Sequence, residues 1–131
     1  MNPEVPELDG VHHVKLPVTD LERSRAWYES RLGYEQVMEF RDGDNVTGLL
    51  MSHPRGGPAL GLWLDPERAS TVAGFDYFAF GAPNRKALEE LAARLTSLGE
   101  LHPGVHPGTI GWVLSHVKDP DGHELRFQCA T

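Results

Sequence analysis

A strand–helix unit occurs twice in this chain, and the repeat restricts the fold more than any other feature of the sequence. The first copy spans residues 11–33 and reads VHHVKLPVTDLERSRAWYESRLG. A shift of 64 residues places His13 on Tyr77, Val14 on Phe78, Leu16 on Phe80 and Asp20 on Asn84. Because an internal repeat indicates repeated structural units, the chain is predicted to fold as two similar modules.

The pattern within each copy predicts a strand followed by a helix. In the first copy, Val14, Leu16 and Val18 alternate with polar or small neighbours, which is typical of a half-buried strand. Asp20 is placed to cap the following helix, and Gly33 is placed to end it. In the second copy, a cap, a leucine stripe and a stop follow in the order Asn84, Leu88, Leu91, Leu95, Leu98 and Gly99.

Three further strands are predicted after each helix. In the first half they span about 34–40, 46–52 and 59–64, and residues 67–73 form a connection. In the second half they span about 101–105, 110–118 and 124–129, and a type I turn, Asp119-Pro120-Asp121-Gly122, joins the last two.

The predicted fold class is therefore α+β, with two tandem βαβββ modules at about 9–66 and 74–130 within a single domain of residues 1–131. The eight strands are expected to form one curved mixed sheet around a concave pocket, with the helices outside. Side-chain alternation divides the strands into two faces. The face under the helices is predicted to hold Val14, Leu16, Val18, Leu60, Leu62, Phe78, Phe80, Leu125 and Phe127, and the pocket face His13, Lys15, Gly61, Trp63, Tyr77, Ala79, Glu124, Arg126 and Gln128.

The charge balance and the single cysteine narrow the classes of partner. A net charge of −7 argues against nucleic-acid binding, which needs clustered Lys and Arg. The lone Cys129 excludes an intrachain disulfide, and no apolar run approaches the length of a membrane span. The acidic, Pro-rich start, MNPEVPELDG, is interpreted as a short flexible arm. We therefore expect a cytoplasmic protein that binds neither nucleic acid nor membranes.

Several short motifs in a fixed order resemble a known superfamily. They are His13-Val14, Asp20-Leu21, Trp27-Tyr28 before Leu32-Gly33, the repeat at 76–80, and the turn 119–122 before the last strand. Together with the repeat, they make the chain similar to the vicinal-oxygen-chelate superfamily, which includes glyoxalase I, bleomycin-resistance proteins and extradiol dioxygenases. The resemblance covers His13 to Phe127 and implies a small-molecule pocket and a homodimer.

The resemblance also implies four inward positions at which metal-using members hold a divalent ion. In this chain these positions correspond to His13, Gly61, Tyr77 and Arg126. Only His13 is a usual ligand, and a guanidinium about 4 Å from a dication would be repelled by roughly 8 kcal/mol at an effective dielectric constant of 20. We therefore expect no cofactor. If the register shifted by two residues near Gly122, Glu124 would take the ligand place, so a divalent metal on His13 and Glu124 stays open.

The predicted ligand-binding residues are His13, Lys15, Trp63, Tyr77, Glu124 and Arg126. Of these, His13 and Tyr77 are the candidate catalytic residues, as acid–base groups. Each also has a plainer interpretation, because His13 can be an ordinary sheet histidine and Tyr77 a pocket wall. Arg126 suits a ligand carboxylate, enolate or phosphate, or it can simply pair with Glu124.

Three functions remain open on the sequence. The first is metal-independent binding of a small organic ligand that carries an anionic or enolisable group. The second is a lyase, isomerase or dioxygenase of the same superfamily, either with a rearranged metal site or without metal. The third is a non-catalytic structural or regulatory dimer. His102 and His106 are interpreted as loop residues, and no role is assigned to His12, His53, His116 or His123.

Overall fold

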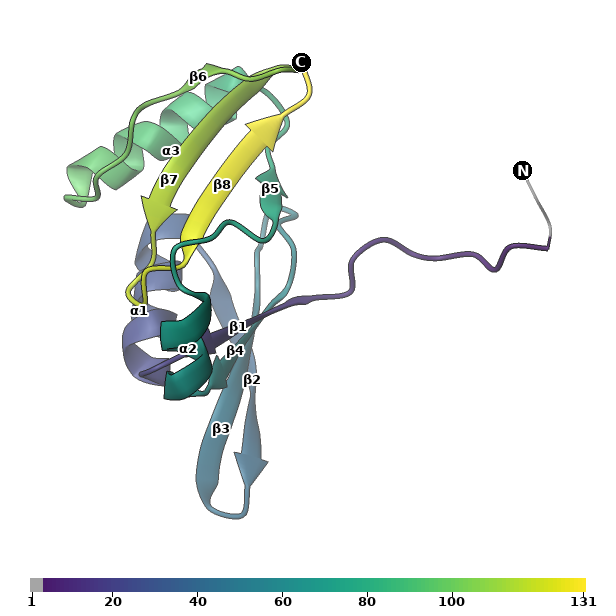
Figure 1. Cartoon of the computed structure of the whole chain (residues 1–131), viewed down its shortest axis with the longest axis vertical. Coiled ribbons are helices and arrows are strands. Elements are labelled where there is room, and N and C mark those ends of the chain that lie inside the picture. The colour runs from purple at the N-terminus through teal and green to yellow at the C-terminus, as the bar shows by residue number, and fades with distance from the viewer. Residues whose placement is uncertain (1–3) are drawn as a thin grey trace.

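The computed structural model describes residues 4–131 and contains two four-stranded mixed sheets. The first sheet has the order β1-β4-β3-β2 and consists of β1 (Val14–Val18), β2 (Glu35–Asp42), β3 (Asn45–Ser52) and β4 (Leu60–Leu64). The second has the order β5-β8-β7-β6 and consists of β5 (Ala79–Gly81), β6 (His106–Pro107), β7 (Trp112–Lys118) and β8 (Glu124–Cys129). The predicted α+β fold of two βαβββ modules is confirmed, and Figure 1 shows the modules stacked along the long axis of the molecule.

The two predicted helices begin and end as their caps require. Helix α1 (Leu21–Leu32) starts at Asp20, whose side chain accepts a 3.0 Å hydrogen bond from the Arg23 amide, and it ends at Gly33, where φ is 84°. Helix α3 (Arg85–Ser97) starts at Asn84. These contacts satisfy amides that the first helical turn leaves free, so the sequence determines both helix starts locally.

Three details of the prediction are wrong. The eight strands form two separate sheets, and within residues 4–131 no strand ladder joins them, because the modules meet through side chains. Residues 66–72, predicted as a connection, form helix α2 (Pro66–Val72), which Asp65 caps; seven residues are too few to show a clear period. The predicted strand at 101–105 is absent, since Pro103 has no backbone N–H to donate and Gly104 adopts a φ of 86°.

The core lies between each sheet and its helices, and the predicted alternation of faces holds. Leu16 and Val18 of β1 are fully buried, and Leu125 and Phe127 of β8 are buried while their neighbours are only partly covered. Leu98 departs from the predicted stripe, because it lies past the end of α3 and is 38% exposed.

A set of polar contacts, which we call the polar junction, fastens the second module to the first. The Tyr28 hydroxyl of α1 donates to Asp119 in the β7–β8 turn at 2.7 Å. Asp121 of the same turn accepts from the Thr19 hydroxyl at 2.6 Å and from Arg23. The β7–β8 turn therefore contacts Thr19, which follows β1, and also Arg23 and Tyr28 of α1.

The N-terminal arm leaves the body on the side away from the helices, as Figure 1 shows. Val5, Leu8 and Val11 are 64%, 89% and 70% exposed, so these three apolar side chains lie largely in solvent. Residues 1–3 of the predicted arm lie outside the described residues. Across residues 4–131, every helix is too short or too polar to traverse a bilayer.

Candidate functional site

Each sheet has one face that the helices leave uncovered, here called its open face. The open face of the first sheet carries two rows of side chains. Strand register aligns Pro17, Trp63, Gly48 and Phe40 in one row, and Lys15, Gly61, Leu50 and Met38 in the next. Both rows are rich in apolar and glycine residues. The open face therefore offers a shallow apolar surface with one cation at its edge.

Trp63 is the largest group on this surface, and its neighbours hold it in place. The Lys15 ammonium lies 4.1 Å from the centre of the indole, within the range of a cation–π contact. The centres of the Phe40 and Trp63 rings lie 6.2 Å apart. A side chain at Gly48 would meet the indole at 2.8 Å, so the glycine makes room for the tryptophan.

His13 lies directly before β1 and next to the second row. Its ring approaches the position that a Gly61 side chain would take, at 3.7 Å. The Nδ1 atoms of His12 and His13 lie 2.9 Å apart, and both rings are exposed. The first sheet thus brings together His13, Lys15 and Trp63, and with Phe40 these residues form what we call the first half-site.

The second sheet brings together a different polar group. The Arg126 Nε donates to Gln128 at 3.3 Å, and Arg126 Nη1 lies 3.9 Å from an Asp76 carboxylate oxygen. Glu124 is on the same face, two residues before Arg126, opposite Lys118 of β7. Arg126 thus faces Asp76 and Gln128 rather than Glu124, and its side chain remains 37% exposed. We call Glu124, Arg126 and Gln128 the second half-site.

Tyr77 is directed toward the polar junction. Its hydroxyl lies within hydrogen-bond reach of His123 Nδ1 and 3.1 Å from the carbonyl of Val72. The other ring nitrogen of His123 donates to the carbonyl of Pro17 at 2.6 Å. Burial and the nearby Asp119 carboxylate raise the pKa of Tyr77, so its hydroxyl keeps its proton at neutral pH.

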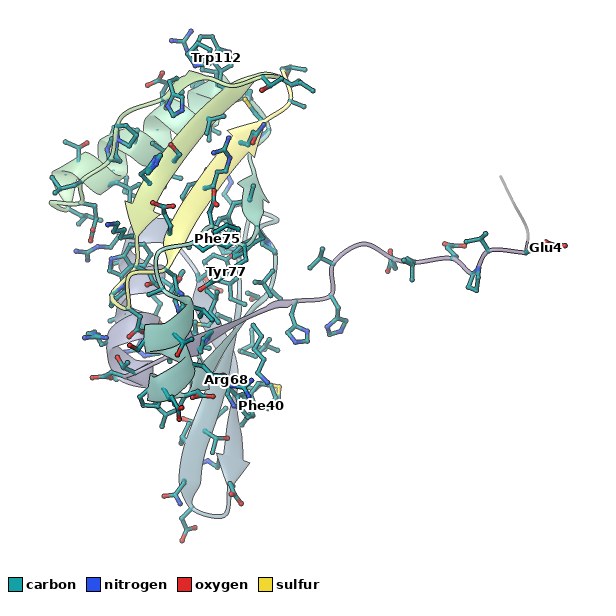
Figure 2. The ribbon with its side chains drawn as sticks, viewed as in Figure 1. Glu4, Phe40, Arg68, Phe75, Tyr77 and Trp112 are labelled. Atoms are coloured by element: carbon teal, nitrogen blue, oxygen red, sulfur yellow. The ribbon has the colours of Figure 1, made fainter. Side chains whose placement is uncertain are left out.

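The predicted site residues therefore fall into separate groups. Within residues 4–131, no hydrogen bond or ion pair links His13, Lys15 or Trp63 to Glu124 or Arg126. Figure 2 shows Tyr77 near the middle of the molecule, between Phe40 of the first sheet and Trp112 at the far end of the second.

The four positions implied for a metal do not provide a suitable donor set within one chain. Lys15 pairs with Gly61 in the first module, and Ala79, its counterpart in the repeat, pairs with Arg126 in the second. The register therefore places Arg126, and not Glu124, at the position equivalent to Gly61. A glycine and a guanidinium at equivalent positions offer no metal ligand. Among the side chains of residues 4–131, no three His, Cys, Asp or Glu residues are grouped to hold an ion.

The sequence reasoning missed several residues of the site and its support. His123, to which no role was assigned, is fully buried and joins Tyr77 to β1. Asp119 is 5% exposed, and burial raises the pKa of its carboxyl. Phe40 pairs with Gly48 because the register shifts between Phe40 and Arg41; regular pairing from the turn at 42–45 would set Phe40 opposite Thr47, so the predicted hairpin alone does not place it. The burial of His123 had no local signal.

Comparison with protein families gives one match across most of the chain. Residues 10–127 match the model of the Glyoxalase/Bleomycin resistance protein/Dioxygenase superfamily. The uncharacterized protein YqjT of Bacillus subtilis (strain 168) is 28% identical over 123 residues, which cover 85% of this chain and 91% of YqjT.

Solved structures share the fold. A glyoxylase/bleomycin resistance protein/dioxygenase domain from Frankia sp. EAN1pec superimposes with a TM-score of 0.77 at 25% identity, covering 95% of this chain and all of that one. TnmS3, an antibiotic-binding protein from Streptomyces sp. CB03234, superimposes with a TM-score of 0.73 at 17% identity, covering 97% of this chain and 100% of its own. At this low identity, the second likeness concerns the fold alone.

Proposed function

The chain belongs to the Glyoxalase/Bleomycin resistance protein/Dioxygenase superfamily, and from this premise we propose that it binds a compact organic molecule on the open faces of its sheets. The observation that carries the proposal is the aromatic surface of Trp63 and Phe40 with the Lys15 ammonium at 4.1 Å. A planar ligand can stack on such a surface, while the ammonium attracts an anionic or enolisable group. TnmS3, which shares the fold, is itself named as an antibiotic-binding protein.

The second half-site supports an anionic ligand. Arg126 is held by a neutral amide and by a carboxylate at the long distance of 3.9 Å, so its guanidinium can still take a ligand carboxylate. A planar guanidinium suits a carboxylate, an enolate or a phosphate. Lys15 and Arg126 thus give each half-site one cation in a chain whose net charge is −7.

We propose that binding does not depend on the divalent metal common in this superfamily. The support is the donor set, in which His13 is the one usual ligand and Arg126 adds positive charge where a carboxylate is expected. Elemental analysis of protein purified without chelators tests this proposal. We expect less than one tenth of an equivalent of Zn, Ni, Mn or Fe per chain, and a stoichiometric metal that is lost in His13→Ala would contradict it.

We further propose a cytoplasmic homodimer. Strand β2 is an open sheet edge on which Val37 and Met38 are 56% and 47% exposed, and open edges with apolar side chains favour pairing. A second copy would also allow half-sites from different chains to face each other. Light scattering coupled to size exclusion should give twice the chain mass, and a monomer at micromolar concentration would reject the dimer.

A catalytic role is the second candidate, and the observation that favours it is the exposed His13 imidazole of the first half-site. His13 would act as a general base or acid, and Tyr77 would serve as a proton donor if its contact with His123 opens. In a screen of lyase, isomerase and dioxygenase substrates, His13→Ala should lower any turnover by about 100-fold or more. A structural or regulatory dimer is supported instead if the chain pairs but binds no small molecule.

The decisive test compares two tryptophans that each lie under a cation. Titration with aromatic carboxylates, followed by calorimetry, should give saturable binding that Trp63→Ala weakens by about tenfold. Trp112→Ala is the matched control, because Arg85 lies 3.7 Å over its ring on the second module, away from the first half-site. If Trp63→Ala binds like the unchanged protein, the aromatic surface is not the binding site.

A further inference from the structure

A groove between the two modules takes no part in the function proposed above. It has a volume of about 920 Å³, and the end of α1, the β3–β4 connection, β5 and the first turns of α3 bound it. Pockets for small molecules commonly measure roughly 300–1,000 Å³. We propose that this groove, which we call the basic groove, is a second binding site and takes a small amphipathic organic anion.

The floor of the basic groove is apolar and aromatic. Phe80 and Phe127 stack with their ring centres 4.7 Å apart, and Tyr34 lies 6.4 Å from Phe80. Leu32 and Leu91 extend this surface along the two helices. Tyr34, Phe80 and Phe127 are only 2%, 6% and 5% exposed, so the floor is a closed apolar surface that a ligand body can rest on but not enter. The Tyr34 hydroxyl already donates to a backbone carbonyl, so it is not left unpaired.

The rim of the basic groove concentrates positive charge on an acidic protein. Its charged residues are Arg31, Arg55, Lys86, Arg94 and Glu90. Four of the 12 Lys and Arg residues thus line one groove together with one of the 19 Asp and Glu residues, while the whole chain carries a net charge of −7. This local reversal of sign selects for an anion.

Two of these cations keep their charge available. Arg94 donates to the Ser30 carbonyl at 2.9 and 2.6 Å, which orients the guanidinium without neutralising it. The exposed Arg55 guanidinium forms no ion pair with any of the described residues. A ligand carboxylate or sulfonate can therefore pair with guanidinium groups from both walls of the groove.

The other two cations are partly engaged. Lys86 lies 3.8 Å from Glu90 across one exposed helical turn, which is a weak pair that a ligand anion can replace. Arg31 is paired with Glu100 at 2.9 Å and contributes little net charge. The expected anion position is therefore between Arg55 and Arg94, where Lys86 adds positive charge that a ligand can use.

The wall formed by the β3–β4 connection is preformed. The His53 ring contacts the Leu32 carbonyl at 2.8 Å through Nε2 and accepts from the Arg55 amide at 3.1 Å through Nδ1. Its ring also packs against Tyr34, with centres 5.1 Å apart. A side chain at Gly57 would meet His53 Cβ at 2.9 Å. These contacts hold the wall in place before any ligand arrives.

The basic groove is on the opposite side of the second sheet from the second half-site. Ala79 pairs with Arg126, and the next register pair is Phe80 with Phe127. Because successive side chains point to opposite faces of a strand, the groove floor and Arg126 face away from each other. A ligand in the groove therefore occupies a site separate from the open faces.

The test uses the fluorescent probe 8-anilinonaphthalene-1-sulfonate and its displacement by decanoate, with the full-length chain. We expect saturable probe binding that decanoate competes away and that decanol, which lacks the charge, displaces poorly. The double variant Arg55→Glu/Lys86→Glu should raise the Kd of the probe by about tenfold or more. Arg41→Glu/Arg68→Glu is the matched control, because it reverses two exposed cations that lie outside the groove.

Each of the following outcomes would overturn the proposal of a ligand site in the basic groove. Probe binding that Trp63→Ala abolishes and Arg55→Glu/Lys86→Glu leaves unchanged would assign the ligand to the open face. Equal losses in both double variants would indicate a general charge effect. If the unsubstituted protein does not bind the probe and Arg55→Glu/Lys86→Glu no longer dimerises, a second copy of the chain covers the groove. Circular dichroism of each variant confirms that it is folded, so that unfolding does not mimic lost binding.

Discussion

Replacing Tyr28 with Phe removes one hydroxyl from the polar junction and leaves a buried carboxylate short of a donor. Tyr28 is fully buried, and its hydroxyl donates to Asp119 Oδ2 at 2.7 Å. The other carboxylate oxygen accepts from the amides of Asp121 and His123, each at 2.9 Å. Oδ2 thus loses the hydrogen bond that Tyr28 supplies, and the ring itself still fills its place in the core.

The expected cost depends on pH, because Asp119 titrates. Hydrogen bonds to charged groups contribute about 1.5–3 kcal/mol, so Tyr28→Phe should lower the free energy of unfolding by about 2 kcal/mol at pH 7. Burial raises the pKa of Asp119, and the Tyr28 hydroxyl opposes that rise. A carboxyl with a raised folded pKa stabilises the fold below its unfolded pKa, near 3.9, and loses that contribution as the pH rises through the folded value. Because Tyr28→Phe removes the hydroxyl that opposes this rise, it raises the folded-state pKa of Asp119 further. The loss of unfolding free energy should therefore be about 1 kcal/mol in acid and about 2 kcal/mol at pH 7.

Urea unfolding at a series of pH values from 4 to 8 measures this dependence. Tyr34→Phe is the matched control, because its buried hydroxyl donates at 2.6 Å to the uncharged carbonyl of Pro58. The control should cost about 1 kcal/mol at every pH. A Tyr28→Phe cost that stays constant with pH, or grows toward acid, would refute the assignment of a charged Asp119 as the acceptor.

Three further predictions concern other contacts. Gly48→Val should displace the Trp63 indole, which a β-carbon would meet at 2.8 Å, and should weaken binding of aromatic carboxylates by about tenfold or more in calorimetry, with a shifted tryptophan emission. Gly111→Ala should lower the unfolding free energy by about 2 kcal/mol or more in urea, since φ is 66° and the new carbon would lie 2.0 Å from the Cys129 carbonyl oxygen. Asp121→Asn should cost about 1–2 kcal/mol in the same assay, because its carboxylate, 3% exposed, accepts charged and neutral donors from the β1–α1 connection.

Local sequence signals predicted most of the fold. The caps at Asp20 and Asn84, the stop at Gly33 and the turn before β8 all act through contacts within four residues, so they are visible without tertiary information. The repeat then fixed the order of elements in both modules. The separation into two sheets was not predictable, because it depends on side chains that meet across the modules.

The candidate site was predicted in part for the same reason. Strand alternation predicted that Lys15 and Trp63 share one face, and the structure brings them into contact. The sequence could not show that Tyr77 is directed toward His123, since 46 positions separate them and the contact forms only when β5 and β8 pair within the second module. Glu124 and Arg126 share the predicted face, yet the guanidinium contacts Asp76 and Gln128.

The polar junction and the basic groove lie at equivalent places in the repeat, because each lies between the connection before the last strand of one module and the long helix of the other. The β7–β8 turn of the second module meets α1 of the first through Tyr28 and Asp119, beside an opening of about 640 Å³ that Trp27 and Pro120 help to line. The β3–β4 connection of the first module faces α3 of the second, and there the two surfaces stand apart as the groove. The two equivalent places thus differ in their side chains, because one holds a buried, hydrogen-bonded carboxylate and the other a groove rimmed by cations. Residues at matching positions of the two copies are consequently not exchangeable, and grafting the β3–β4 connection onto the second module would remove the carboxylate to which Tyr28 donates.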